Sequence, residues 1–253
     1  MFAFPEIDPV ILHIWGPVAL RWYNLAYILG FGLGFCALKW WQRKKDIIST
    51  TAIDAFLPWA ILSVVIGGRV GEFLFFHKSD QDFIEILYIW HGGMSFHGAL
   101  GGLLIGTYIF CKKYKINYLS WLDHLSLVAP IGVFFGRIAN FINDELYGRL
   151  TFLPWAVRFP SGGFLPRHPS QLYEAFFEGV MLFTIINFSA LEKNSLSNPG
   201  KTAGIFLAFY GFFRFCIEFT REPDGWWGPI TIGQALCLPM IMYGLFLALR
   251  KKS

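Results

Sequence analysis

The chain has 253 residues, of which 55% are hydrophobic and 15% are charged, and its mean hydropathy is +0.49. Soluble globular chains carry about 25% charged residues. This deficit excludes a soluble enzyme, a disordered chain and a nucleic-acid binder with a basic face, and it predicts that the surface lies in lipid. The net charge of +4 becomes informative only through the places where the charges fall.

Apolar segments along the chain predict seven transmembrane helices. Two of them, residues 86–111 and 225–249, contain no Asp, Glu, Lys or Arg, and each exceeds the roughly 20 residues needed to cross the hydrocarbon layer. The other five are expected at residues 19–38, 53–76, 119–141, 172–191 and 202–219. The predicted fold is therefore an all-α polytopic membrane protein, a single integral membrane domain over residues 1–253.

The lysines predict the orientation of these helices. Basic clusters follow the first, third, fifth and seventh spans, so ten of the eleven lysines fall on one side, and Lys78 alone falls on the other. The positive-inside rule makes that side cytoplasmic, with the N-terminus outside and the C-terminus inside. Eight of the ten arginines lie instead on the outer side or inside spans, which indicates a different use for arginine.

Two outer segments are expected to be more than simple loops. Residues 79–91 mix acidic and large apolar side chains, a pattern typical of an amphipathic helix lying on the membrane surface. Residues 143–170 are rich in Gly, Pro and Arg and are expected to form a small outer head, with a short strand pair around residues 155–159. The N-terminus carries Glu6 and Asp8 in place of a basic region, so no cleaved signal peptide is expected.

Charged residues inside spans are costly and are functional candidates. Four groups share a helical face: Arg69 with Glu72, Arg214 with Glu218, Arg137 with Asn140 and Asp144, and Glu174 with Glu178. The structural alternative is a set of buried ion pairs that fix helix register, and for Arg69 and Glu72 the two interpretations are balanced. For Arg137 and Arg214 function is favoured, because one acidic neighbour leaves guanidinium donors able to bind a phosphate.

His97 lies among glycines near the outer end of the third span. Gly98, Gly102 and Gly106 form a stripe of small residues suited to close helix packing. An isolated histidine in an apolar stretch is commonly a core residue, but the surrounding glycines favour a general base or a ligand contact. Tyr23, at the outer end of the first span, is explained on physical grounds as part of the interfacial aromatic belt.

Together these residues indicate an anionic, amphipathic ligand. Several arginines, a candidate base, and Asn and Tyr donors converge on the outer half of a helical bundle. A phospholipid headgroup entering sideways from the outer leaflet fits best. The reaction does not follow from these residues alone.

One long motif resembles a known family. Residues 136–149, Gly-Arg-Ile-Ala-Asn-Phe-Ile-Asn-Asp-Glu-Leu-Tyr-Gly-Arg, closely resemble the signature of the prolipoprotein diacylglyceryl transferases. Further stretches similar to that family are residues 4–9, 21–23, 67–69, 92–98, 168–174, 210–219 and 221–224. The chain departs from many relatives at Ala139 and Asp144, where they have Gly, and at Tyr147, where they have Trp.

The resemblance implies a transferase that performs the first step of bacterial lipoprotein maturation. Such enzymes move the diacylglyceryl group of phosphatidylglycerol to the lipobox cysteine of a preprolipoprotein signal peptide. A thioether forms and glycerol 1-phosphate leaves, with no metal or organic cofactor. The implied partners are these two substrates and membrane lipid, not nucleic acid, and the implied location is the bacterial cytoplasmic (inner) membrane.

The resemblance also assigns residues. Arg137 is implied as the headgroup contact, Arg214 and Glu218 as a second functional pair, and Tyr23 and His97 as functional positions. The residues implied to shape the headgroup site are Asn140, Asn143, Glu145 and Gly148. Arg137 and Arg214 would stabilise the leaving phosphate, and His97 would be a base, a hydrogen-bonding group or a wall of the site.

Two other classes compete with this transferase. A transporter or flippase for an anionic lipid would use the Arg–Glu pairs as gating charges, but such proteins commonly show internal repeats, and the sequence has none that is visible. A membrane scaffold without activity would not need several Arg and Asn side chains around one outer site.

Overall fold

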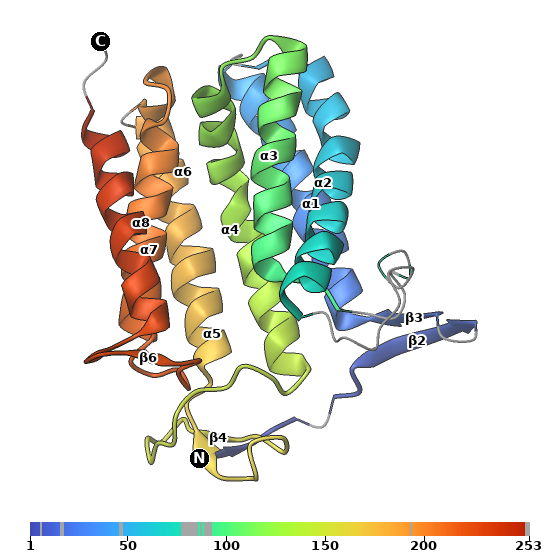
Figure 1. The fold of residues 1–253 in the computed structure, drawn as a ribbon, viewed down its shortest axis with the longest axis vertical. Helices are drawn as coiled ribbons and strands as arrows, with labels where there is room; N and C mark the ends of the chain where they lie inside the picture. The colour runs from blue at the N-terminus through green and yellow to red at the C-terminus, as the bar shows by residue number, and fades with distance from the viewer. Residues whose placement is uncertain are drawn as a thin grey trace. The chain divides into compact units, whose positions relative to one another are not determined.

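The computed structural model describes residues 1–5, 7–15, 18–45, 48–76, 86, 88, 93–192 and 194–250. Two compact units make up the chain. The first contains Met1–Ile14, Ala19–Gly34 and Leu122–Ser253, and the second contains Trp15–Val18 and Phe35–Trp121. Both units consist mainly of long helices (Figure 1).

A helix overlaps every predicted span. The helices are α1 (Trp22–Lys45), α2 (Thr50–Phe76), α3 (Phe96–Tyr114), α4 (Tyr118–Ile142), α5 (Ser170–Glu174) continued by the π-helix η3 (Ala175–Met181) and α6 (Leu182–Glu192), α7 (Lys201–Ile217) and α8 (Ile232–Leu249). Among the described residues, four helical stretches are long and apolar enough to cross a membrane: Thr50–Leu74, Tyr118–Ile142, Ser170–Glu192 and Ile232–Leu249. The prediction of a polytopic, mostly helical membrane protein is confirmed.

Three predicted helix starts were too early. Helix α3 begins at Phe96 because Ser95 Oγ caps it by accepting from Gly98 N at 3.2 Å, immediately after Gly93 adopts a φ of 73°. Helix α8 begins at Ile232, where Thr231 forms a capping box with Gln234; such a box satisfies backbone donors at the first turn. The chain before α1 is a strand, β3 (Val18–Arg21).

The second unit is held together by close contact between α2 and α3. A Cβ atom placed on Gly102 would overlap the Ser63 carbonyl oxygen and lie 2.7 Å from Gly67 Cα. The small-residue stripe predicted on α3 therefore lets the two backbones touch. Near the C-terminal end of α3, the aromatic rings of Phe56, Phe110 and Trp121 pack together with centroids 5.0–5.2 Å apart.

The first unit packs α7 against α8 and joins α7 to α4. The α7–α8 contact again uses glycines, since a Cβ atom on Gly204 would lie 2.6 Å from Ala248 N. Asp123 on α4 is fully buried and accepts hydrogen bonds from the backbone N–H groups of Gly200 at 2.7 Å and Ala203 at 2.8 Å. A carboxylate at this place satisfies the free amides and the positive end of the helix dipole of α7.

Short strands occupy the ends of the helices. Strands β1 (Phe2–Ala3), β4 (Val157–Arg158) and β5 (Pro166–Arg167) form one sheet, in which β1 is parallel and β5 antiparallel to β4. The strand pair predicted around residues 155–159 is therefore confirmed. Two further pairs are β2 (Val10–Trp15) with β3, and β6 (Trp226–Trp227) with β7 (Ile230–Thr231). Residues 79–91, predicted as an interfacial helix, lie outside the described residues except for Ile86 and Tyr88.

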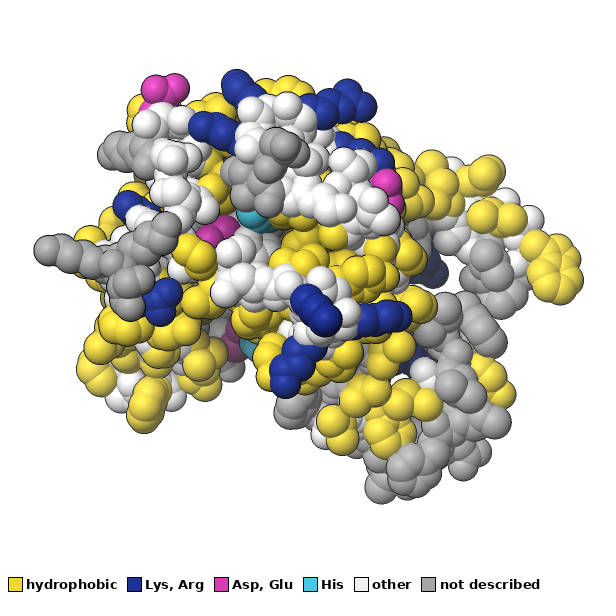
Figure 2. All heavy atoms as spheres, turned by 90° about the horizontal axis from the view of Figure 1, so that it is seen from above, with side chains coloured by type: hydrophobic (Ala, Val, Ile, Leu, Met, Phe, Trp, Pro, Cys, Tyr) yellow, Lys and Arg dark blue, Asp and Glu magenta, His cyan; other side chains and the backbone are white. Residues whose placement is uncertain are grey.

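Large apolar side chains are exposed along the helices. Examples are Leu74 on α2, Ile105 on α3 and Met242 on α8, which are 70%, 64% and 71% exposed. Figure 2, seen from above, shows hydrophobic side chains over much of the surface, with Lys and Arg side chains gathered among them. Water would not tolerate this much contiguous apolar surface, so the helices face lipid.

Candidate functional site

A buried carboxylate lies at the centre of the polar residues of the first unit. The side chain of Glu174, at the end of α5, is fully buried and contacts three arginines. Arg137 Nε lies 3.1 Å from Glu174 Oε2, Arg221 Nη1 donates to Glu174 Oε1 at 2.8 Å, and Arg214 Nη1 also donates to Oε1. One carboxylate thus joins α4, α5, α7 and the turn after α7.

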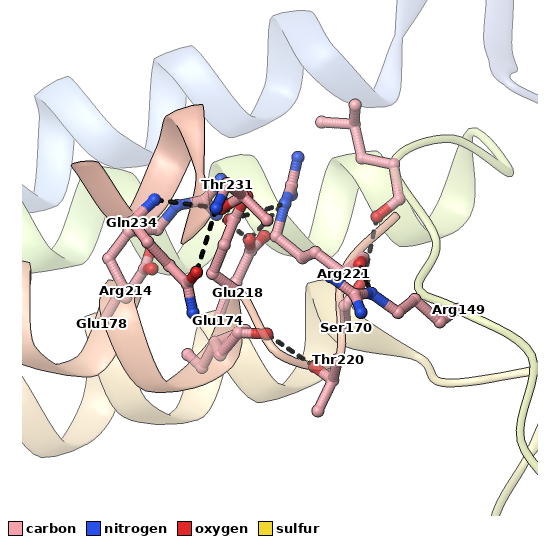
Figure 3. Close-up of polar contacts among 12 residues, drawn as sticks. Arg149, Ser170, Glu174, Glu178, Arg214, Glu218, Thr220, Arg221, Thr231 and Gln234 are labelled. Atoms are coloured by element: carbon pink, nitrogen blue, oxygen red, sulfur yellow. Dashed lines mark hydrogen bonds and ion pairs between the residues drawn. The ribbon is translucent and has the colours of Figure 1, made fainter. Parts of the chain in front are cut away.

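A second carboxylate, that of Glu218, completes the contacts of Arg214. Arg214 Nη2 lies 3.2 Å from Glu218 Oε2, so its guanidinium bridges Glu174 and Glu218. Thr231 Oγ1 donates to Glu218 Oε1 at 3.1 Å, and Arg221 Nε lies 3.7 Å from Oε2. Figure 3 shows these side chains converging. The i, i+4 pairing of Arg214 with Glu218, predicted from spacing, is confirmed.

The third carboxylate, Glu178, is held more loosely. Its side chain is fully buried, Arg137 Nη2 lies 3.6 Å from its Oε2, and neither oxygen accepts a hydrogen bond from the described residues. Glu178 lies within the π-helix η3, which begins directly after Glu174. Single π-helical turns inside α-helices are frequent at functional sites. We call these six residues, Arg137, Arg214, Arg221, Glu174, Glu178 and Glu218, the arginine–glutamate cluster.

Arg137 also begins a chain of polar contacts toward α1. Its Nη1 lies 3.5 Å from Asn140 Oδ1. Asn140 Nδ2 donates to Glu145 Oε1 at 3.0 Å and also to the Tyr23 hydroxyl. The structure therefore brings together Tyr23, Arg137, Asn140 and Glu145, and Tyr23 is part of a hydrogen-bonded network rather than only an interfacial aromatic residue.

The part of the motif that follows α4, residues 143–149, is called the motif loop, and it is held mainly through its backbone. Gly148 N donates to His168 O at 2.8 Å, and a Cβ atom on Gly148 would overlap the Thr220 carbonyl oxygen. Gln171 Nε2 donates to Glu145 O at 2.6 Å, which holds the loop against α5. Asn143 Oδ1 is buried and accepts no hydrogen bond from the described residues. Glycine is required at position 148 because the chain segments touch there.

Asp144 does not join Arg137, although the spacing placed them on one face. It adopts a φ of 56°, just past the end of α4, and its Oδ2 accepts from Ser161 N at 2.6 Å. The helix ends at Ile142, so helical spacing no longer applies at Asp144.

His97, Arg69 and Glu72 belong to the second unit. His97 is an exposed residue in the first turn of α3. Arg69 Nη1 donates to Gly93 O at 2.8 Å and its Nε to Ile86 O at 3.2 Å. Arg69 thus ties the segment before α3 to α2, which supports a structural role.

Sequence reasoning named Glu174 and Glu178 among the charged functional candidates and noted Arg221 in a stretch similar to the family, but it gave none of the three a role in the site. Their spacing carried a signal, because Glu174 and Glu178 are four residues apart and Arg221 follows Glu218 by three. The spacing within each helix did not reveal that Glu174 joins arginines from three segments. Among the described residues, no group of three or more His, Cys, Asp or Glu side chains is arranged to hold a metal ion.

The cluster balances three guanidinium groups against three carboxylates. Arg137 and Arg214 are 19% and 16% exposed, whereas Glu174 and Glu178 are fully buried. The arginines are therefore the charged groups that a ligand can reach, and guanidinium forks suit phosphate oxygens.

The fold and this site define a multi-pass membrane protein with a buried arginine–carboxylate centre in its helices. The family model described as prolipoprotein diacylglyceryl transferase matches residues 9–250. The chain belongs to that family, as its motifs predicted.

Similar proteins are found among the rickettsiae. A phosphatidylglycerol–prolipoprotein diacylglyceryl transferase of Rickettsia akari is 45% identical over 252 residues, which cover 97% of each chain. The protein of the same name from Rickettsia typhi is 46% identical over 256 residues and 98% of each chain.

Proposed function

We propose that this protein transfers the diacylglyceryl group of phosphatidylglycerol to the lipobox cysteine of a prolipoprotein, the first step of lipoprotein maturation. The relatives that are named for this activity align with the chain over nearly their whole length. The observation that carries the proposal is the arginine–glutamate cluster, which offers partly exposed guanidinium groups to an anionic headgroup within membrane-embedded helices.

The reaction forms a C–S bond and breaks a C–O bond. The cysteine sulfur attacks the phosphate-bearing carbon of the diacylated glycerol, and glycerol 1-phosphate leaves with the electrons of the broken C–O bond. A free thiol has a pKa near 8.5, so its proton must pass to a base, for which His97 is the candidate. His97 as a hydrogen-bonding residue or a wall of the site remains the alternative.

The leaving phosphate monoester needs charge stabilisation. We assign this to Arg137 and Arg214, since one well-placed donor in a dry site contributes about 3–4 kcal/mol. Arg137 would also hold the headgroup. The residues that would shape the site are Tyr23, Asn140, Asn143, Glu145, Gly148 and Glu218.

The proposed setting is the bacterial cytoplasmic membrane. The lysine distribution supports seven spans, an outer N-terminus and a cytoplasmic C-terminus. In that orientation residues 143–170 form a small outer head and residues 79–91 lie at the outer interface of one membrane domain, residues 1–253.

A purified transfer assay tests the arginines. Phosphatidylglycerol with a labelled glycerol headgroup is mixed with a lipobox peptide, and release of label and thioether formation are measured. Arg137→Ala and Arg214→Ala should lower transfer by about 100-fold or more in folded protein. Arg158→Ala, at an exposed position, is the matched control, and near-normal transfer by either test variant would contradict the assignment.

The same assay separates the transferase from a lipid transporter. Release of labelled glycerol phosphate should require the peptide, whereas a transporter would move phosphatidylglycerol across vesicles without releasing it. For His97→Gln, the pH–rate profile should lose the limb that reports the base. A profile unchanged in shape and height would exclude the base role.

A further inference from the structure

Glu174 has the geometry of a residue that sets the position of others. It contacts Arg137, Arg214 and Arg221, which come from α4, from α7 and from the turn after α7. Its own side chain is fully buried, whereas those of Arg137 and Arg214 reach the surface in part. Glu174 therefore contacts the arginines on their buried side, where it can hold them without touching a ligand.

The contacts of Arg137 are graded in strength. Its Nε is held by Glu174 at 3.1 Å, but its Nη1 lies 3.5 Å from Asn140 and its Nη2 lies 3.6 Å from Glu178. Charge–charge attraction and hydrogen bonding both weaken toward these longer distances. The two Nη groups at the outer end of the guanidinium fork thus have longer contacts than Nε, so phosphate oxygens can compete for them.

The charge of Glu174 is needed as well as its shape. Three guanidinium groups around one point repel each other strongly where water is scarce. Glu218 reaches Arg214 at 3.2 Å but lies 3.7 Å from Arg221, and Glu178 reaches Arg137 at 3.6 Å. Glu174 is the carboxylate in the cluster that contacts all three, so neutralising it should let them separate.

Local packing fixes the carboxylate. Glu174 directly precedes the π-helix η3, and a Cβ atom on Gly179 would lie 2.8 Å from Phe134 Cβ. Helix η3 therefore lies directly against α4, the helix that carries Arg137. Gln171 and Ser170 hold the start of α5 against the motif loop through Glu145 O and Leu146 O.

We propose that Glu174 is a positioning residue for the transfer reaction, holding Arg137 and Arg214 in the arrangement that binds the leaving phosphate. This inference rests on the proposed function. Arg221 acts with Glu174 as part of the same support.

Kinetics of Glu174→Gln distinguish this role from simple stabilisation of the fold. The variant keeps the shape of the side chain but shifts the cluster from neutral to one net positive charge. The added positive charge attracts the anionic lipid and should offset part of the binding lost when Arg137 moves, so KM for phosphatidylglycerol should rise by less than kcat falls. Misplaced arginines should lower kcat by about 100-fold. A wild-type kcat, or a loss that lies entirely in KM, would overturn the proposal.

Two further variants separate position from net charge. Glu174→Gln combined with Arg221→Gln restores a neutral cluster, and kcat should stay low because Arg137 and Arg214 remain unsupported. Recovery of kcat in this double variant would mean that only net charge matters. Glu174→Asp keeps the charge with a shorter reach and should give an intermediate kcat. If Glu174→Gln does not fold, Glu174→Asp takes its place. A wild-type kcat for Glu174→Asp would then overturn the proposal.

A readout without turnover keeps this test distinct from that of the proposed function. Arginine Nε–H signals can be followed by NMR in ¹⁵N-arginine-labelled protein, with that of Arg137 assigned through Arg137→Lys. Because Arg137 Nε lies 3.1 Å from the buried Glu174 Oε2, this signal should exchange slowly with water in the wild type and faster in Glu174→Gln. Unchanged exchange would overturn the positioning role even if the wild type transfers no lipid. Glu192→Gln, at an exposed position on α6, is the matched control.

Discussion

At the scale of single residues, Arg214 shows why arginine rather than lysine occupies the cluster. Its Nη1 donates to Glu174 and its Nη2 lies 3.2 Å from Glu218. A lysine ammonium is a compact point charge that cannot span two carboxylates in this fork geometry. We expect Arg214→Lys to lower transfer at least about tenfold, measured as thioether formation by purified protein.

The control for that exchange is Arg158→Lys, which makes the same chemical change at an exposed strand position. It should leave transfer unchanged. Full activity of Arg214→Lys would show that a positive charge alone suffices and that the fork has no role.

His168 gives a pH dependence outside the membrane-spanning helices. Burial lowers the pKa of its imidazole below the ordinary value of 6.5; its Nδ1 lies 3.2 Å from the Tyr173 hydroxyl. The unfolded chain then binds a proton more readily than the folded one, so this residue reduces stability as pH falls through about 6.5 and below. Thermal unfolding in detergent should show a melting temperature that falls more steeply with acidification in the wild type than in His168→Gln. Parallel curves for the two proteins would contradict this.

At the scale of helices, backbone contact decides which glycines matter. On α3, a Cβ atom on Gly102 would lie 2.7 Å from Gly67 Cα, whereas one on Gly101 would have nothing within 4 Å. Gly102→Ala must push α2 and α3 apart and should lower stability by about 1–3 kcal/mol.

Gly101→Ala is the matched control in the neighbouring position. It adds the same methyl group to open space and should be neutral or slightly stabilising, since glycine is a poor helix former. Thermal unfolding of both proteins in detergent measures the difference, and equal melting temperatures would mean that α2 and α3 do not pack as closely as described.

The helices were largely predictable from the sequence, and their ends were not. Long apolar segments identified a helix at each predicted span, because lipid leaves few alternatives to a fully hydrogen-bonded helix. The apolar run from residue 225 nevertheless contains the β6–β7 turn, with Gly228 at a φ of 61°. Hydrophobicity does not separate a strand turn from a helix at the membrane interface, whereas the Thr231–Gln234 capping box marks the true start of α8.

Several residues of the candidate site were predictable from the sequence, but the contacts that join them were not. Helical spacing correctly paired Arg214 with Glu218. It could not show that Glu174 also contacts Arg137 and Arg221, because those contacts join segments far apart in the sequence. Spacing also failed for Asp144, which lies beyond the end of α4 and turns to Ser161.

At the scale of the whole molecule, charge placement predicts orientation. Lys112, Lys113 and Lys115 lie at the C-terminal end of α3, whereas Phe152 follows the end of α4 and is 85% exposed. The positive-inside rule predicts that the three lysines lie in the cytoplasm. Because α4 begins just after them and is long and apolar enough to cross the membrane, we expect Phe152 on the outer side.

Cysteine labelling of intact bacteria tests this orientation. The four native cysteines, Cys36, Cys111, Cys216 and Cys237, are first replaced by serine, and retained transfer activity shows that the chain still folds. A membrane-impermeant maleimide should then label Phe152→Cys in intact cells, because the outer side is open to the reagent. Lys113→Cys should be labelled only after lysis, because the lipid layer keeps the reagent from the cytoplasm. The opposite pattern would invert the topology, and with it the side from which phosphatidylglycerol and the prolipoprotein reach the arginine–glutamate cluster.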